Sequence, residues 1–156
     1  MLFSNASNGA PIEIGANIPD TKATLDSGEV IDLAEAAAEG FALVYFYPKA
    51  STPGCTKQAC SLRDAYEVLT EKNVKIFGVS KDSVQSQLRF KEKYALPFSL
   101  VADSKSEVIK AFGVPTKLGF ASRQAFLFKD GELVWRDLAA STAKQAEDVL
   151  EFLNQS

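Results

Sequence analysis

Histidine is absent from this chain of 156 residues. Its absence excludes Cys–His and Ser–His nucleophile activation, histidine general bases and histidine-ligated metals. Cysteine is scarce, with only Cys55 and Cys60, and two thiols alone make a poor zinc site. A reactive side chain in this protein must therefore be activated by backbone dipoles and by a cation such as arginine.

The chain also lacks an excess of positive charge and a long hydrophobic run. A net charge of -3 gives no basic field, so we do not expect nucleic acid as a partner. No apolar run approaches the roughly 20 residues of a membrane span, and Met1 to Ile18 has neither a basic start nor a long apolar segment. We expect no membrane association and a cytoplasmic location, with an organellar location after processing as the alternative.

The composition predicts one globular domain over residues 1–156, because 46% hydrophobic residues are enough to bury a core. Such a domain needs no disulfide framework. The cytosol keeps thiols reduced, so two cysteines in a chain without a secretory signal favour redox or nucleophilic use over structural staples.

Strands and helices are predicted to alternate along the chain. We expect a hairpin within residues 20–32, then the continuous apolar strand Phe41–Tyr47, which Pro48 ends. Helices are predicted from Thr56 to about Thr70 and, after a cap at Asp82 or Ser83, to about Tyr94, the second with Val84, Leu88 and Tyr94 facing inward. The remaining predicted elements are strands at 74–80, 99–102, 124–128 and 133–136 and helices at 106–112 and 143–153. This order indicates an α/β fold, a mixed central sheet with helices on both faces.

Cys55 is the main candidate for chemistry. Thr52 is a good helix N-cap and Pro53 suits the first helical position, so Cys55 falls at the third, near unpaired backbone N–H groups and the positive end of the helix dipole. An entry loop with prolines and Gly54 lets backbone approach a ligand closely. The alternative is that Cys55 is only a small buried hydrophobic residue.

Cys60 lies five residues after Cys55 and has core-like neighbours, so it too has a purely structural interpretation. In one helix the two residues are separated by about 7.5 Å along the axis. This exceeds the roughly 4.4–6.8 Å between Cα atoms that a disulfide tolerates. The two cysteines can form a disulfide only if that part of the helix unwinds.

Four arginines could supply the activating cation: Arg63, Arg89, Arg123 and Arg136. Arg123 directly precedes the apolar run Ala125–Phe128, and a strand end could bring it beside the start of the cysteine helix. Arg63 is followed by Asp64 and is expected to form an exposed ion pair of little value. A guanidinium near Cys55 would favour the thiolate and hold an oxygen-rich substrate.

These residues carry a resemblance to a known family. Pro48, Thr52 and Cys55 form the pattern P-x-x-x-T-x-x-C, with Cys60 completing C-x4-C. The pattern resembles the active-site signature of peroxiredoxins, specifically the bacterioferritin-comigratory-protein or Q-type group. This group often has glutamate where the chain has Gln58 and phenylalanine where it has Leu62.

The resemblance implies a thioredoxin-like fold and thiol-dependent reduction of hydrogen peroxide and organic hydroperoxides, with no metal or organic cofactor. It implies that Cys55 is the peroxidatic cysteine, that Thr52 hydrogen-bonds the peroxide and that Pro48 shields the pocket. Arg123 then stabilises the thiolate and the transition state, and Cys60 resolves the sulfenic acid as an intramolecular disulfide. Thioredoxin or a similar dithiol is the expected reductant, and a monomer is the expected state.

Two rival functions use the same residues. A peroxide-sensing relay or thiol-based binding module would pass oxidation to a partner without sustained turnover. A thioredoxin-like disulfide reductase would reduce disulfides without peroxide, although C-x4-C is poorly matched to that task.

Overall fold

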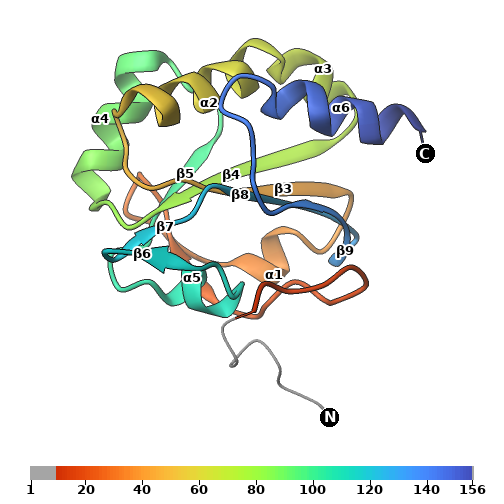
Figure 1. Cartoon of the computed structure of the whole chain (residues 1–156), viewed down its shortest axis with the longest axis horizontal. Coiled ribbons are helices and arrows are strands. Elements are labelled where there is room, and N and C mark those ends of the chain that lie inside the picture. The colour runs from red at the N-terminus through yellow and green to blue at the C-terminus, as the bar shows by residue number, and fades with distance from the viewer. Residues whose placement is uncertain (1–9, 156) are drawn as a thin grey trace.

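The computed structural model of the chain describes residues 10–155. The predictions made for the N-terminal stretch before Ala10 lie outside the described residues. A five-stranded sheet of order β5-β4-β3-β8-β9 forms the centre of the fold (Figure 1). Its strands are β3 (Phe41–Phe46), β4 (Val74–Ser80), β5 (Ser99–Ala102), β8 (Gln124–Lys129) and β9 (Glu132–Asp137). β3, β4 and β5 are parallel, whereas β8 and β9 are antiparallel to their neighbours, which confirms the predicted mixed sheet.

Strand β3 is central because it is apolar on both faces. Its residues from Ala42 to Phe46 are completely buried, as expected for a strand covered by helices on each side. The strand ends before Pro48, which has no N–H to donate to a neighbouring strand. The segment after β3 therefore leaves the sheet and leads directly to Cys55.

Helices cover both faces of the sheet, as the sequence predicts. Figure 1 shows α2, α3, α4 and α6 on one face, with α1 and α5 on the other. The helices are α1 (Leu33–Ala36), α2 (Pro53–Asp64), α3 (Tyr66–Glu71), α4 (Val84–Tyr94), α5 (Glu107–Ala111) and α6 (Gln145–Gln155). None of the helices within residues 10–155 has the length and apolar character of a membrane span.

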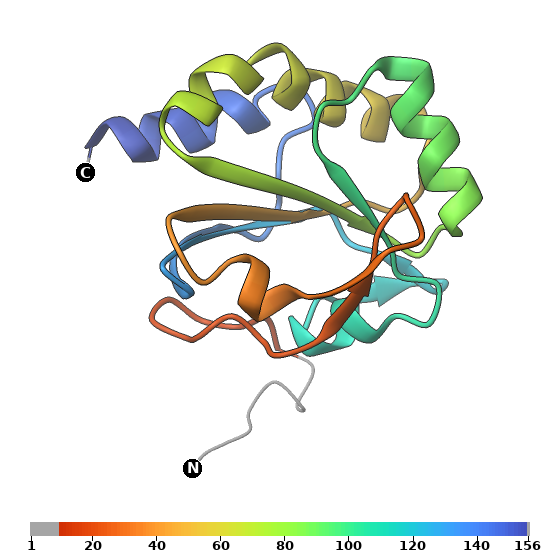
Figure 2. The ribbon, with the colours of Figure 1, turned by 180° about the vertical axis from the view of Figure 1, so that it is seen from behind.

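The predicted N-terminal hairpin is also confirmed. Strand β1 (Lys22–Thr24) pairs antiparallel with β2 (Val30–Asp32), and Figure 2 shows this hairpin on the face of the sheet opposite α2. Asp26 in its turn region accepts a hydrogen bond from the Leu100 backbone N–H at 2.9 Å and pairs with Lys91 at 3.4 Å. These contacts fix the hairpin to the edge strand β5 and to helix α4.

The predicted helix from Thr56 to Thr70 was wrong in its continuity. Helix α2 ends at Asp64, and Ala65 is its C-cap, with a backbone N–H that donates to the Ser61 and Arg63 carbonyl oxygens. Helix α3 follows as a separate helix. The apolar positions keep the same helical spacing across the break, so the periodicity does not reveal it. Two short strands, β6 (Thr116–Lys117) and β7 (Phe120–Ala121), were not predicted because each has only two residues.

Helix α4 differs from prediction in the face that it buries. Leu88 is exposed, and Val84 and Tyr94 are only partly buried, whereas Gln87 and Phe90 are completely buried. Gln87 can be buried because its amide nitrogen donates to the Val101 carbonyl at 2.8 Å and to Ser80 Oγ at 3.0 Å. Hydropathy predicts that Leu88 is buried and Gln87 exposed, and hydrogen-bond partners in β4 and β5 reverse this order.

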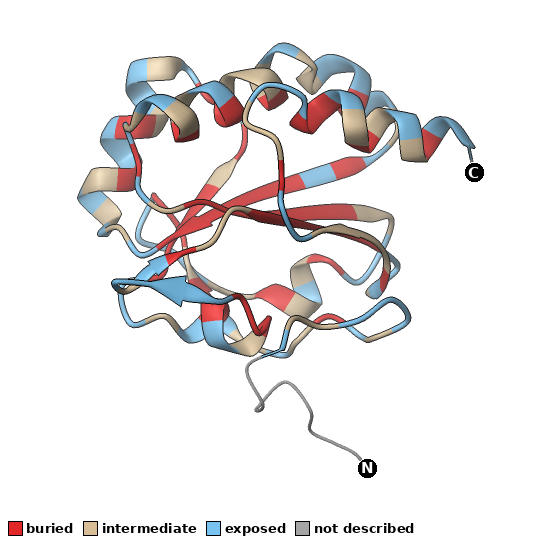
Figure 3. Ribbon diagram, in the orientation of Figure 1, coloured by how far each residue is buried: buried red, intermediate tan, exposed pale blue. Residues whose placement is uncertain are grey.

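Buried residues, coloured red in Figure 3, form two core layers, one on each face of the sheet. The layer beneath α2, α3, α4 and α6 contains Tyr45, Tyr47 and Cys55. Tyr45 lies opposite Gly78 in the neighbouring strand, and a Cβ at that glycine would approach the tyrosine ring and hydroxyl to 2.8 Å. The same Cβ would lie 2.9 Å from Leu100 Cδ2, so Gly78 is required by the Tyr45 and Leu100 side chains and not by a turn.

Candidate active site

Cys55 occupies the third position of α2, as predicted. The helix begins at Pro53 with Thr52 as N-cap, and Cys55 is only 1% exposed. Ser51, just before the cap, has a φ of 66°, which turns the chain sharply from the β3 loop into the helix. Since the first N–H groups of a helix have no intrahelical acceptor, the Cys55 sulfur lies in an environment that stabilises negative charge.

Arg123 lies beside Cys55. The sequence predicts this position, because Arg123 directly precedes a predicted strand whose end could lie next to the cysteine helix. Gln124 at the start of β8 pairs with Phe46 at the end of β3, so the antiparallel register brings residue 123 to the start of the cysteine loop. Arg123 Nη1 donates a hydrogen bond to Cys55 Sγ at 3.5 Å and to Gln58 Oε1 at 2.8 Å. A fixed positive charge therefore lies in contact with the sulfur.

Gly54 lies between the helix start and the guanidinium. A Cβ at this residue would lie 3.1 Å from Arg123 Nη2 and 3.4 Å from the Thr142 methyl carbon. The absence of a side chain thus allows Arg123 to lie against the first turn of α2. Thr142 was not identified from the sequence.

Thr52 occupies the cap position, but its side chain makes no capping bond. Its hydroxyl instead donates to the Lys49 carbonyl at 2.7 Å. The hydroxyl proton is thereby used within the loop, and the oxygen lone pairs remain available as acceptors. Such a hydroxyl oxygen can accept a hydrogen bond from the O–H group of a hydroperoxide.

Pro48 is half-buried where β3 ends, and the loop after it is held by Asp82. Asp82 Oδ2 accepts the Ala50 N–H at 2.8 Å and the Ser80 hydroxyl at 2.6 Å, and Oδ1 accepts the Ser86 hydroxyl at 3.0 Å. We considered Asp82 only as a helix cap, a role that Ser83 fills by accepting the Ser86 N–H. Loop bracing by a side chain 32 positions away leaves no local pattern in the sequence.

Cys60 lies in the same helix as Cys55 and is half-buried. Both cysteines are free thiols. At about 1.5 Å per residue, an intact helix keeps them too far apart for a disulfide. The structure therefore brings together Thr52, Gly54, Cys55 and Arg123 and keeps Cys60 apart.

Two buried glutamines extend the contacts of Arg123. Gln58 Nε2 donates to Gln145 Oε1 at 2.8 Å, and both side chains are completely buried. The sequence analysis noted Gln58 only as a departure from the usual glutamate and did not identify Gln145. A sequence signal for Gln145 exists, because it lies at four-residue steps from Val149 and Leu153, which are also buried.

Tyr45 in β3 and Tyr47, just after the end of that strand, lie in the same core layer as Cys55. Burial raises the pKa of Tyr45 and of Tyr47 well above the ordinary value of 10.0, so both phenols are neutral at physiological pH. The Tyr47 hydroxyl donates to Gln87 Oε1 at 2.7 Å, whereas the buried Tyr45 hydroxyl has no hydrogen-bond partner among residues 10–155.

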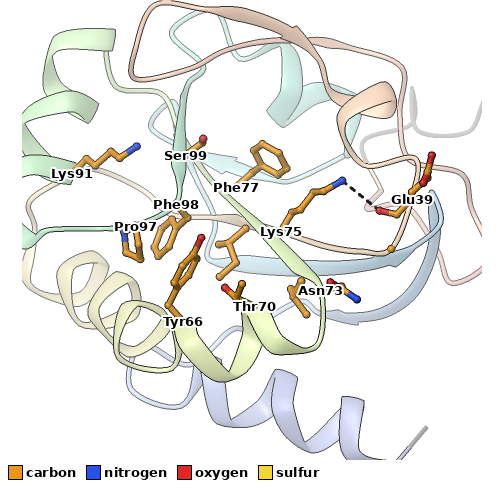
Figure 4. A pocket seen from close by; sticks show the side chains of 13 residues that line it. Glu39, Tyr66, Thr70, Asn73, Lys75, Phe77, Lys91, Pro97, Phe98 and Ser99 are labelled. Carbon is orange, nitrogen blue, oxygen red and sulfur yellow. Dashed lines mark hydrogen bonds between the residues drawn. The ribbon is translucent and has the colours of Figure 1, made fainter.

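Two of the other candidate arginines have partners away from Cys55. Arg63 forms the expected ion pair with Asp64 at 3.0 Å and also donates to the Tyr94 carbonyl, and Arg136 donates to the Ile12 carbonyl at 2.7 Å. Within residues 10–155, no cluster of three or more cysteine, aspartate or glutamate side chains is arranged to hold a metal ion. A cavity of about 620 Å³ lies between α3, β4 and residues 97–99, and the side chains that line it include none of the predicted site residues (Figure 4).

Comparison with known proteins decides the family. Residues 14–136 match the AhpC/TSA family, which is well over half of the chain. The chain belongs to the AhpC/TSA family. It is 40% identical over 135 residues to peroxiredoxin Bcp of Bacillus subtilis, a match that covers 80% of this chain and 85% of the relative.

Solved structures agree with this family. The fold is similar to that of peroxidoxin BcpB from Mycobacterium tuberculosis, with a TM-score of 0.85, 28% identity and coverage of 92% of this chain and 97% of the other. It is also similar to the bacterioferritin comigratory protein of Xanthomonas campestris, with a TM-score of 0.83, 31% identity and coverage of 94% and 98%. These matches confirm the predicted resemblance to the Bcp and Q-type peroxiredoxins, the thioredoxin-like fold and the prediction that the chain is an enzyme, a thiol-dependent peroxidase.

Proposed function

We propose that Cys55 is the peroxidatic residue of this peroxidase and that Arg123, Thr52, Gly54 and Pro48 form its substrate site. The contact of 3.5 Å between Arg123 Nη1 and Cys55 Sγ, in the first turn of α2, is the observation that carries the proposal. It supplies the cation that activation requires in a chain without histidine.

In the first step the Cys55 thiolate attacks one oxygen of a hydroperoxide, an S–O bond forms and the O–O bond breaks. The leaving alkoxide or hydroxide takes up a proton and departs as an alcohol or water, and Cys55 becomes a sulfenic acid. Arg123 and the free N–H groups of the helix start stabilise the charge that develops on the leaving oxygen. Thr52 accepts a hydrogen bond from the bound peroxide and Pro48 excludes solvent.

In the second step Cys60 resolves the sulfenic acid. After the first turns of α2 unwind, the Cys60 sulfur attacks the Cys55 sulfur, water leaves and an intramolecular disulfide forms. The placement of both cysteines in one helix supports this order, because the intact helix delays the reaction between them. An external dithiol then reduces the disulfide by thiol exchange.

Hydrogen peroxide and organic hydroperoxides are the proposed substrates, and thioredoxin or a similar dithiol is the proposed reductant. The Xanthomonas campestris relative has been described in terms of alkyl peroxide reduction, which supports the organic class. Comparing kcat/KM for hydrogen peroxide and cumene hydroperoxide, with thioredoxin or glutathione as the reductant, would test both assignments.

We also propose that residues 1–156 form a single domain that acts as a monomer in the cytoplasm. One central sheet with both faces covered supports a single domain, and two cysteines held apart in one helix suit a reducing compartment. Apart from Leu118 and Phe120, which share the β6–β7 hairpin, the exposed large hydrophobic side chains lie in separate parts of the fold, among them Val30, Val68, Leu88 and Leu138, which supports a monomer. Light scattering after size-exclusion chromatography would test the oligomeric state.

The central experiment is a peroxide-consumption assay coupled to thioredoxin, thioredoxin reductase and NADPH. We expect Cys55→Ser to abolish turnover, because serine cannot form the sulfenic acid. Cys60→Ser should still consume one equivalent of peroxide but should not turn over with thioredoxin. Full activity in Cys55→Ser would refute the assignment, and thioredoxin-supported turnover in Cys60→Ser would replace the resolving step with a one-cysteine mechanism.

A further inference from the structure

We propose that Gln145 is a positioning residue for the peroxidatic site, acting on Arg123 through Gln58. This inference rests on the proposed role of Arg123 and concerns a residue in α6, the last helix of the chain. The contacts run in one line: Gln145 Oε1 accepts from Gln58 Nε2 at 2.8 Å, Gln58 Oε1 accepts from Arg123 Nη1 at 2.8 Å, and the same Nη1 donates to Cys55 Sγ.

The chemistry of the three groups permits only one direction of hydrogen bonding. A guanidinium has donors and no acceptor, so the oxygen of the Gln58 amide must face Arg123. The nitrogen of that amide then faces Gln145 and requires an acceptor, which the Gln145 oxygen supplies. With the Gln58 amide reversed, its NH2 group would point at Arg123 and leave the guanidinium without this acceptor.

Burial makes the orientation matter. Gln58 and Gln145 are both completely buried, so solvent cannot substitute for either partner. The Gln145 Nε2 has no hydrogen-bond partner within residues 10–155 and is inaccessible, which costs free energy that leucine or methionine would not. The presence of Gln145 despite its unpaired nitrogen is explained by the need for its oxygen as the acceptor for Gln58 Nε2.

The same contact braces α2 in its reduced form. Gln58 lies between the two cysteines, so the unwinding that brings Cys60 to Cys55 must separate Gln58 from Gln145. The neighbouring bond from the Ala146 N–H to Ser61 Oγ at 3.3 Å also joins α6 to α2. Loss of the Gln145 oxygen should therefore slow the oxidation of Cys55 and accelerate the formation of the disulfide.

The test measures these two steps separately. In a Cys60→Ser background, we expect Gln145→Met to lower the second-order rate constant for sulfenic acid formation, trapped with dimedone and measured by mass spectrometry, about tenfold; a 1 Å displacement of a catalytic group costs up to roughly a hundredfold. With Cys60 present, the rate of disulfide formation from the sulfenic acid should rise about fivefold, as expected from one lost hydrogen bond.

Two controls distinguish positioning from structural support. Gln145→Glu keeps an oxygen acceptor for Gln58 Nε2 and should retain most of the wild-type oxidation rate. Val149→Ala removes buried side-chain volume from α6 one turn away without touching the amide contacts, and it should slow oxidation far less than Gln145→Met does.

The inference is overturned if Gln145→Met oxidises at the wild-type rate or if Val149→Ala slows oxidation equally. Failure of the underlying function gives a different result, since the Cys60→Ser parent would then form no sulfenic acid at Cys55 with peroxide.

Discussion

The two faces of the central sheet bury side chains of different chemistry. The face beneath α2 and α6 encloses buried glutamines, two tyrosines and Cys55, and the glutamines, Tyr47 and Cys55 are each hydrogen-bonded to another element. The opposite face, covered by the hairpin, α1 and α5, contains a cluster of aromatic rings: Phe46, Phe112, Phe126 and Phe128.

This difference separates stability from chemistry. Ring pairs with centroids 5.1–5.8 Å apart need only shape and burial, so the phenylalanine face can stabilise the fold while helices on the other face rearrange. The polar face fixes side-chain positions through directed bonds, and breaking one bond affects the next. In the proposed mechanism α2 unwinds during each catalytic cycle, and it lies on the polar face.

Substitutions at neighbouring residues of β8 should give the largest effects. Phe126 and Leu127 are both completely buried but belong to opposite core layers. We expect Phe126→Ala to lower the free energy of unfolding by about 3–5 kcal/mol and to leave the rate of Cys55 oxidation per folded molecule unchanged.

The matched variant Leu127→Ala should lower the unfolding free energy by about 2–5 kcal/mol and also slow the oxidation, since it removes packing beneath the site helices. Urea unfolding and single-turnover peroxide kinetics would measure both. Equal kinetic effects in the two variants would contradict a functional difference between the faces.

Arg123→Met should have the next largest effect. Removing the guanidinium takes a preorganised charge from the reacting sulfur, and we expect kcat/KM for peroxide to fall about a hundredfold. Arg136→Met is a suitable control, because that residue is bonded to the Ile12 carbonyl and not to Cys55. A similar loss in both variants would show that general destabilisation, and not the contact with sulfur, is responsible.

Alkaline pH should weaken the polar face. Because burial raises the pKa of Tyr45 and Tyr47, the stability that their neutral forms contribute is complete below the unfolded value of 10.0 and is lost as the pH rises toward the folded values. The free energy of unfolding should fall above about pH 10 by about 1.4 kcal/mol per pH unit for each tyrosine. Urea titrations from pH 8 to 11 would measure this slope, and the Tyr45→Phe, Tyr47→Phe double variant should remove that contribution.

The two tyrosines should differ when they are replaced singly. Tyr47→Phe leaves Gln87 Oε1 without its donor and should lower the free energy of unfolding by about 1–2 kcal/mol. Tyr45→Phe removes a hydroxyl that has no partner in the described part of the chain and should change stability by less than about 1 kcal/mol, or increase it. If both variants lost equal stability, the hydrogen bond to Gln87 would not be the cause.

Local patterns were sufficient for much of this fold and site. The apolar runs at β3 and β4 and the Thr-Pro start of α2 gave the positions of those elements and placed Cys55 in the first helical turn. The resemblance then implied the role of Arg123, whose position beside sulfur depends on the pairing of β8 with β3.

The interactions that were missed join residues distant in the sequence. Gln145 meets Gln58 across 87 positions, and burial of Gln87 depends on partners from β4 and β5 and on Tyr47. A polar residue on a helix predicts exposure until such partners are known, which is why Leu88 was expected to face inward in place of Gln87.

The close packing of Tyr45 against Gly78 restricts how this sequence can change. A methyl group at residue 78 would overlap the tyrosine ring and Leu100 Cδ2, so Gly78→Ala should be harmful alone and less harmful when a smaller residue replaces Tyr45. Because Tyr45 shares its core layer with Cys55, variation at a glycine in the next strand is coupled to the packing beneath the reactive thiol. Among homologous chains, these two positions should therefore vary together.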